Sequence, residues 1–194
     1  MKKSLLVLLL GSLLQAEAVK SKENSWGIEF NPFRLLTHED GWRSYSGGFS
    51  YFDYQKGVEI AVPWLYGKDR YEEYYDYAIY DELLINVDIQ YRIYPDREIG
   101  GFFWGGFARY AYLEGEALDR PSIAKQHKFG LGGIIGYRVV QFYEETPLYL
   151  GVSLSLGSYL NQENDIFANN NFAFSMDDRK FFMDIELLKI GIEF

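Results

Sequence analysis

The sequence predicts an all-β fold, an eight-stranded antiparallel up-and-down transmembrane β-barrel, on three observations. Apolar and polar residues alternate along eight segments, most of them ten residues or longer, and a tilted membrane strand needs about 9–11 residues. Aromatic residues form 19% of the chain, although no apolar stretch after the N-terminal one is long enough for a membrane helix. The connections alternate between short and long, which is typical of outer-membrane barrels.

The first 18 residues predict a secretory signal peptide. Lys2 and Lys3 precede a short apolar run at 5–14, and Ala16 and Ala18 frame a small-x-small cleavage site. The run is too short to span a bilayer, because a membrane helix needs about 20 residues. We therefore expect residues 19–194 to form one barrel domain.

Composition narrows the classes of function. The formal net charge is −9, and an acidic secreted chain is a poor nucleic-acid binder. The sequence contains no cysteine, so backbone pairing and burial alone must hold the fold together.

The predicted strands follow the two-residue period of alternation. The clearest is 148–160, where leucine and valine alternate with glycine, serine and tyrosine; 82–94 and 57–67 repeat the pattern. Two strands fit less well. In 45–54 both faces carry aromatic residues, and in 181–194 Asp184 and Glu186 share a face with Phe194 unless a bulge near Leu187 and Leu188 shifts the register. The remaining predicted strands are 26–37, 101–113 and 128–142.

The predicted connections place one set of loops at each end. The short ones are 54–57, 94–100 and 143–147, and the long ones are 38–44, 67–81, 114–126 and 161–178. With both termini in the periplasm, the long loops face the outside of the cell.

Alternation by itself does not exclude a soluble barrel. In such a barrel the apolar face would point inward and hold a ligand. Three features favour lipid instead. The polar face is rich in glycine and serine, the chain finishes on a strand with Phe194, and aromatic residues gather near segment ends. These aromatic residues form a predicted girdle at the lipid interfaces: Trp26, Trp64, Tyr66, Trp104, Tyr110 and Tyr112.

The sequence resembles the small eight-stranded outer-membrane proteins of Gram-negative bacteria, the group of the OmpA transmembrane domain and OmpX. The resemblance rests on the signal peptide, the eight strands, the alternation of short and long loops and the C-terminal "KIGIEF". The resemblance implies a monomer in the outer membrane. It also implies that the last strand is the recognition signal for the barrel assembly machinery, after delivery by periplasmic chaperones. That signal would be Phe194, Ile192, Ile190 and Leu188.

Strand parity predicts a charged interior. A barrel of this size is only wide enough for its own side chains, and unpaired buried charges are costly, so we expect a salt-bridged plug and no open pore. The expected members are Glu29, Glu59, Asp88, Arg92, Arg109, Arg138, Lys189 and Glu193.

Segment 67–81 is a candidate binding loop, since tyrosine supplies rigid amphipathic contact area. Its acidic residues offer contacts to Ca²⁺ or, through Ca²⁺, to lipopolysaccharide, although their spacing matches no calcium motif; a plain solvated loop is the alternative. The tyrosines are Tyr71, Tyr74, Tyr75, Tyr77 and Tyr80.

An enzyme is the least favoured function. Lipid A-modifying barrels of this size exist, and the palmitoyltransferase PagP uses a His–Asp–Ser set, for which His38, Asp40, Ser44 and Ser46 are candidates here. Neither histidine sits in a recognisable motif, and His127 lacks the His-x-Ser pair of the deacylase PagL. No phosphate loop, dinucleotide fingerprint or metal-ligand cluster is evident, so we expect no cofactor, metal or catalytic residue.

The sequence therefore predicts an outer-membrane barrel with a structural role in the envelope or an adhesive role through four extracellular loops. The alternatives are a narrow channel for small solutes and a lipid A-modifying enzyme. Expected partners are outer-membrane lipid, lipopolysaccharide and an extracellular ligand.

Overall fold

The computed structural model describes residues 24–36, 43–73, 78–96, 99–117, 122–140, 147–161 and 180–194. Side chains at 35–36, 69–73, 78–81, 116–117 and 122–124 are not described. The predicted signal peptide and its cleavage site lie outside these residues. The elements are β1 (Ser25–Phe30), α2 (Pro32–Leu36), β2 (Arg43–Asp53), β3 (Val58–Glu73), β4 (Ala78–Ile93), β5 (Gly101–Ala117), β6 (Ser122–Val140), β7 (Leu148–Tyr159) and β8 (Phe181–Glu193).

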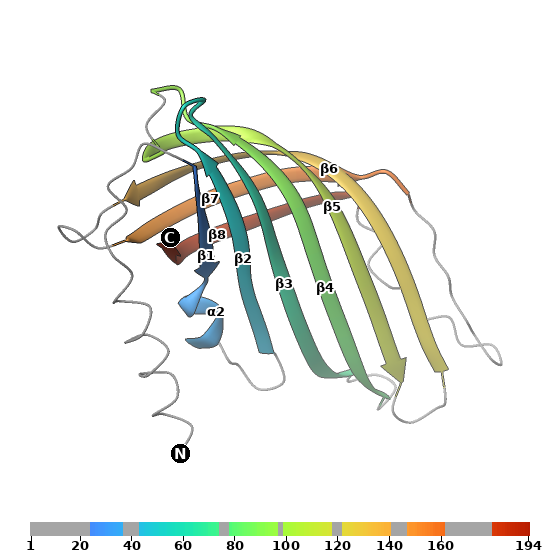
Figure 1. Cartoon of the computed structure of the whole chain (residues 1–194). Helices are drawn as coiled ribbons and strands as arrows, with labels where there is room; N and C mark the ends of the chain where they lie inside the picture. Colours follow the sequence, from blue (N-terminus) through green and yellow to red (C-terminus); the bar gives the residue numbers. More distant parts are fainter. Residues whose placement is uncertain are drawn as a thin grey trace, which may run out of the picture.

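The strands form one closed barrel in sequence order, with every neighbour antiparallel and β8 paired back to β1. Figure 1 shows β1 lying beside β8 near the end of the described chain. The predicted eight-stranded antiparallel up-and-down barrel is therefore confirmed. The β2–β3 turn ends at Gly57, whose φ of 67° favours glycine.

Closure of the barrel requires the strands to be staggered. Following the paired residues from Gly27 through β2 to β7 leads to Phe182 on β8, whereas Gly27 itself pairs with Glu193. A closed sheet must accumulate such a shear, because its strands tilt relative to the barrel axis.

The first strand is shorter than the predicted segment 26–37, which was wrong beyond Phe30. Pro32 has no backbone N–H to donate to a strand, and it is well suited to the first turn of a helix. The Asn31 side-chain oxygen accepts a hydrogen bond from the Phe33 N–H at 3.0 Å and caps the short helix α2.

Two of the predicted long loops are instead largely strand. Strands β3 and β4 continue to Glu73 and from Ala78, and β5 and β6 continue to Ala117 and from Ser122. The segments 67–81 and 114–126 were therefore wrong as loops over their described residues, because antiparallel pairing continues to Glu73–Ala78 and to Ala117–Ser122. Strands β3–β6 form one tall wall of the barrel, visible in Figure 1.

The two ambiguous strands each have a defined register. In β2, Phe52 is fully buried inside the barrel while Phe49 is exposed on the outer face. In β8, the register shifts between the pairs Gly151–Lys189 and Ser153–Glu186. This irregularity confirms the predicted bulge near Leu187 and Leu188.

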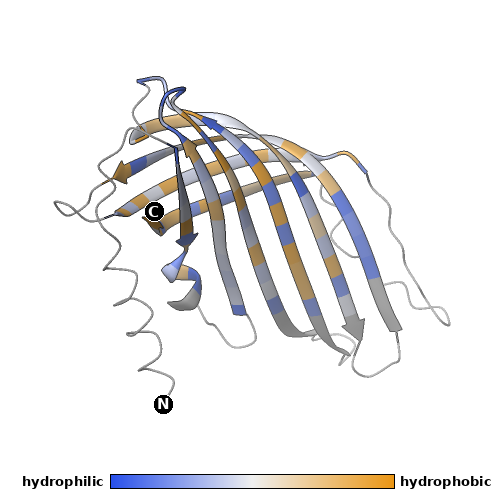
Figure 2. Ribbon diagram, viewed as in Figure 1, coloured by the Kyte–Doolittle hydropathy of each residue, from blue (hydrophilic) through white to orange (hydrophobic). Residues whose placement is uncertain are grey.

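The barrel is apolar outside and polar inside. Figure 2 shows hydrophobic and hydrophilic residues alternating along the strands. The outward set includes Ile89, Leu131, Ile135 and Leu187, all at least 49% exposed, whereas buried positions are rich in charged and polar side chains. The soluble alternative requires the apolar face to point inward, whereas the large apolar side chains of the described strands are mostly exposed.

Among the described residues, no helix has the length and apolar character needed to cross a membrane.

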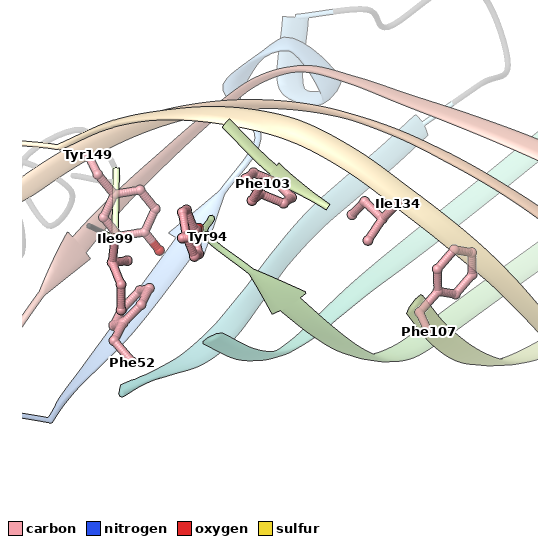
Figure 3. Packing of buried hydrophobic residues seen from close by; sticks show 7 residues of the cluster. All are labelled: Phe52, Tyr94, Ile99, Phe103, Phe107, Ile134 and Tyr149. Carbon is pink, nitrogen blue, oxygen red and sulfur yellow. The ribbon is translucent and has the colours of Figure 1, made fainter. Parts of the chain in front are cut away.

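Figure 3 shows a cluster of buried aromatic and isoleucine side chains among the strands. Phe103 lies opposite Gly136, and Tyr149 lies opposite Gly191 on the neighbouring strand. A Cβ atom on Gly136 would stand 2.3 Å from the Phe103 ring. The inward glycines thus provide the space that these rings occupy. The cluster comprises Phe52, Tyr94, Ile99, Phe103, Phe107, Ile134 and Tyr149.

Candidate functional site in the barrel interior

The structure places all the predicted interior charges within the barrel. Seven of them are at most 8% exposed: Glu29, Glu59, Asp88, Arg92, Arg109, Arg138 and Lys189. The eighth, Glu193, is partly exposed near the short-turn end and accepts hydrogen bonds from Ser25, at 2.5 Å, and from Tyr54. The alternation of each strand brings these residues inside, and the pairing of the strands decides which of them meet.

Glu59 is the centre of the first of two groups of interior charges. Its Oε1 accepts hydrogen bonds from Ser50 Oγ at 2.7 Å, Arg92 Nη1 at 2.8 Å and Arg138 Nη2 at 2.9 Å. Its Oε2 accepts one from the Tyr94 hydroxyl at 2.7 Å. A fully buried carboxylate is retained here because its oxygens are satisfied by two guanidinium groups and two hydroxyls.

Glu29 is the second carboxylate of this group. Its oxygens lie 3.4 Å from Lys189 Nζ and 3.6 Å from the Nη2 atoms of both Arg92 and Arg138. Two carboxylates therefore face three cations, and the group has an excess of positive charge.

Arg138 is held by rings as well as by carboxylates. Its guanidinium carbon lies 4.2 Å from the ring centre of Tyr149 and 4.9 Å from that of Phe52. The Nε and Nη1 atoms are buried and make no hydrogen bond. The electron-rich faces of the rings stabilise the cation where hydrogen-bond acceptors are missing.

A second group lies toward the opposite end of the barrel. Arg109 binds Asp88 through two parallel hydrogen bonds, Nε to Oδ1 at 2.7 Å and Nη2 to Oδ2 at 2.8 Å. Its Nη1 also contacts Asp184, and its guanidinium carbon lies 4.3 Å from the ring centre of Phe182. This bidentate geometry is the strong form of an arginine–carboxylate pair.

Gln90 connects the two groups. Its amide nitrogen donates to Asp88 at 3.2 Å, and its oxygen accepts from Arg92 Nε at 2.9 Å and Nη2 at 2.7 Å. The ion pairs consequently form one polar column along the interior.

Helix α2 is tied to the same column. The Asn31 amide nitrogen donates to Glu186, and Arg34 Nη2 lies 3.3 Å from that carboxylate. The predicted charge network did not include Asp184 or Glu186. It also lacked Tyr94 and the uncharged Gln90 and Tyr149, although strand parity had placed the last two on the polar face. For Asp184 and Glu186, the bulge in β8 was the signal, since it turns both carboxylates inward.

The interior has little free volume beside the column. Two small voids of about 30 Å³ and 10 Å³ adjoin Asp88, Glu29 and Lys189. Neither would hold more than a water molecule or so. The arrangement can keep the charges paired and the wall closed around these two voids.

The predicted girdle residues all lie on outward strand positions. Trp26, Trp64 and Trp104 are between 40% and 58% exposed, and Tyr66, Tyr110 and Tyr112 are partly exposed. Tyr110 lies next to Phe129, with 5.4 Å between ring centres, and its hydroxyl lies 2.8 Å from His127 Nδ1.

The predicted assembly signal lies at the seam between β8 and β1. Ile190 pairs with Phe30 and Ile192 pairs with Ile28. Phe194 pairs with Trp26 through backbone hydrogen bonds, and Leu188 lies at the bulge.

Other predicted positions are only partly described. Tyr71 pairs with Tyr80 across the β3–β4 hairpin; Tyr74, Tyr75 and Tyr77 lie outside the described residues. Of the set suggested by PagP, His38 and Asp40 also lie outside the described residues. Ser44 and Ser46 lie on the inward face of β2, which follows from the alternation of side chains along the strand. Within the described part of the chain, no three His, Asp or Glu residues are placed to hold a metal ion.

No protein family model matches the chain, and no curated protein matches it. Among solved structures, the chain is similar to the crystal structure of the N-terminal β-barrel domain of Pseudomonas aeruginosa OprF. The sequence identity is 18% and the TM-score is 0.44, over 89% of this chain and 98% of that one.

Proposed function

We propose that this chain spans the bacterial outer membrane as a monomeric barrel and has a structural role in the cell envelope. One observation carries the proposal: the barrel exposes its large apolar side chains and buries its charges. In water that distribution would be strongly unfavourable, because apolar surface of this extent is normally covered. In lipid it is favourable, since a closed barrel satisfies its backbone hydrogen bonds within the wall.

The outer face of β5 and β6 supports the proposal with a band of suitable height. The outward pairs from Phe102–Tyr137 to Tyr110–Phe129 are apolar or small, and the next ones are Tyr112–His127 and the ion pair Glu114–Lys125. Nine tilted residues span about 20–25 Å, close to the height of an outer-membrane apolar band. Both termini then lie on the periplasmic side, and the β3–β4 and β5–β6 hairpins rise outside.

The filled interior favours a structural role over a channel or an enzyme. Between Asp88 and the short-turn end of the barrel, the column of ion pairs and the aromatic cluster occupy the lumen. Specificity toward an extracellular ligand or lipopolysaccharide would reside in the external hairpins. We include delivery by periplasmic chaperones and insertion by the barrel assembly machinery in the proposal.

Heat-dependent gel mobility tests this proposal. The full chain is expressed with its N-terminal segment in a Gram-negative host, the membranes are separated, and samples are run in SDS with and without boiling. We expect the protein in the outer membrane and a mobility shift on boiling, because a closed barrel resists SDS. Recovery as a soluble periplasmic protein without a shift would overturn the proposal.

A further inference from the structure

A cavity of about 640 Å³ is lined by the inward side chains of Asn86, Arg109 and Lys128, and it extends to the exposed side chains of Leu156, Phe181 and Met183 on β7 and β8. Its size falls within the range of small-molecule sites. Leu84, Leu113, Tyr159 and Phe182 give it an apolar wall drawn from four strands. The rings of Tyr159 and Phe182 are tilted by 44° to each other, with their centres 4.7 Å apart. The cavity shares Arg109 and Asp184 with the second ion-pair group, and the proposed role in the envelope makes no use of its free volume.

The floor of the cavity is polar. Asn86, Arg109 and Asp184 line both this cavity and the void of about 30 Å³ below it. Asn86 is 6% exposed, and its Oδ1 atom is buried without a hydrogen-bond partner. An unsatisfied buried acceptor is costly, so this oxygen provides an anchor for a ligand that carries a hydrogen-bond donor.

The charges around the floor select the sign of the ligand. Arg109 is shared by two carboxylates, those of Asp88 and Asp184, so the floor has an excess of negative charge. Elsewhere in the lining, Lys128 adds one positive charge, and Glu82 and Glu114 add two negative charges. An incoming carboxylate would face this excess at low dielectric, whereas an ammonium group would be attracted by it.

We infer that this cavity binds a cationic amphiphile, a primary amine on an aromatic or alkyl body, whose ammonium donates to Asn86 Oδ1 while its body packs against Tyr159 and Phe182. The inference concerns the folded barrel and goes beyond the proposed role in the envelope. It depends on the cavity and the residues of its floor. It would hold even if the protein were not located in the outer membrane.

Three isosteric probes test the inference: 2-(1-naphthyl)ethylamine, 2-(1-naphthyl)ethanol and 1-naphthylacetate. Each is titrated calorimetrically into the full-length barrel in nanodiscs, with empty nanodiscs as the blank. We expect the amine to bind best, the alcohol less well and the carboxylate least. Equal or tighter binding of the carboxylate, or no heat above the blank for any probe, would overturn the inference.

Variants locate the binding. Asn86→Leu should weaken the amine at least about tenfold, the effect of losing one hydrogen bond to a charged group. Ser153→Ala is the matched control, because Ser153 Oγ is also buried without a partner but lines only the lower void. Unchanged amine binding in Asn86→Leu, or an equal loss in Ser153→Ala, would contradict the site.

Leu113→Trp provides an independent variant should Asn86→Leu not fold. The larger ring would fill the apolar wall, and binding of both amine and alcohol should be lost. Each variant is first checked for the SDS-resistant form, so that loss of the cavity is distinguished from loss of the barrel. Full amine binding by folded Leu113→Trp would place the ligand elsewhere and refute the inference.

Discussion

Phe194 and Trp26 exchange two backbone hydrogen bonds, Trp26 N–H to the Phe194 carbonyl at 2.9 Å and Phe194 N–H to the Trp26 carbonyl at 2.8 Å. They extend the β1–β8 seam beyond the ladder that runs from Gly27 to Phe30. Because β1 is the shortest strand of the barrel, each added pair contributes noticeably to closure.

Replacing the Phe194 side chain should distinguish a role in recognition by the barrel assembly machinery from a role in the stability of the folded barrel. We expect Phe194→Ala to lower the yield of SDS-resistant protein in outer membranes several-fold while refolding in detergent micelles changes little. The seam hydrogen bonds involve only the backbone and remain. Phe181→Ala, on the same strand and 72% exposed, is the control and should assemble normally. Equal losses in cells and in micelles would assign Phe194 to stability alone.

Deleting one residue at the bulge should be tolerated. Lys189 pairs with Gly151 and Glu186 pairs with Ser153, so deletion of Leu188 removes the extra residue and leaves every other side chain on its present face. Deletion of Ile185 should prevent folding, because it turns Asp184 toward the lipid or forces the strand to slip. Gel mobility of the two deletions is the measurement, and a reversed ranking would refute the register of β8.

Charge on the outer face should have an effect that depends on depth. Leu131→Arg places a cation within the band, where the cost rises to about 2–4 kcal/mol at the midplane, while the same residue near an interface costs about 0–1 kcal/mol. His127→Arg, on the same strand and face beside Tyr112, serves as the interface control. Urea unfolding in lipid vesicles measures both, and equal costs would argue against the membrane placement.

The ion-pair column should be sensitive to the loss of its central carboxylate. Glu59→Gln leaves Arg92 and Arg138 without their nearest counter-charge, and breaking a buried pair in this way costs about 3–5 kcal/mol. The control is Lys56→Gln, which removes an exposed turn pair with Asp53 at 2.7 Å and should change little. Unfolding in detergent gives both values. A Glu59→Gln variant as stable as the parent would show that the column contributes nothing to stability.

The aromatic–glycine pairs should be intolerant of a methyl group. Gly136→Ala brings Cβ within 2.3 Å of the Phe103 ring and 2.5 Å of the Val152 carbonyl oxygen, and overpacking of this kind costs about 1–3 kcal/mol. The nearest atom to a Cβ on outward Gly106 is 3.6 Å away, so Gly106→Ala should be neutral or slightly stabilising. Thermal loss of the SDS-resistant form compares them; similar melting points would contradict the packing.

Several features of the site were readable from the sequence because they depend on local geometry. A strand alternates its side chains strictly, so Glu59, Arg92 and Arg138 shared a face before any partner was known. The conflict between Asp184 and Phe194 located the bulge for the same reason. Pro32 was the local signal for the end of β1, because proline has no backbone N–H to donate to a strand. The alternation around it nevertheless suggested a longer strand.

The partners of those residues depend on non-local pairing. Glu59 meets Arg138 across 79 residues of sequence, and no local pattern specifies that contact. The same holds for the extension of β3–β6, because tyrosines mixed with acidic residues suit a loop as well as a paired hairpin until the neighbouring strand is in place. Strand parity had placed Tyr149 on the polar face, but sequence reasoning did not identify the aromatic cluster, since the space for its rings comes from glycines on neighbouring strands.

The sequence by itself determined that eight strands with two unlike faces would form, and which residues share each face, because the two-residue period is a property of the extended backbone. The glycine- and serine-rich polar face favoured an inward polar face, and the tertiary structure established it. Both kinds of barrel have the same alternation, and the choice follows from the stagger at closure and from whether the enclosed side chains can fill the lumen and pair their charges. Here the polar face can do both, with rings lying over glycines and carboxylates beside arginines, and the apolar face is left outside.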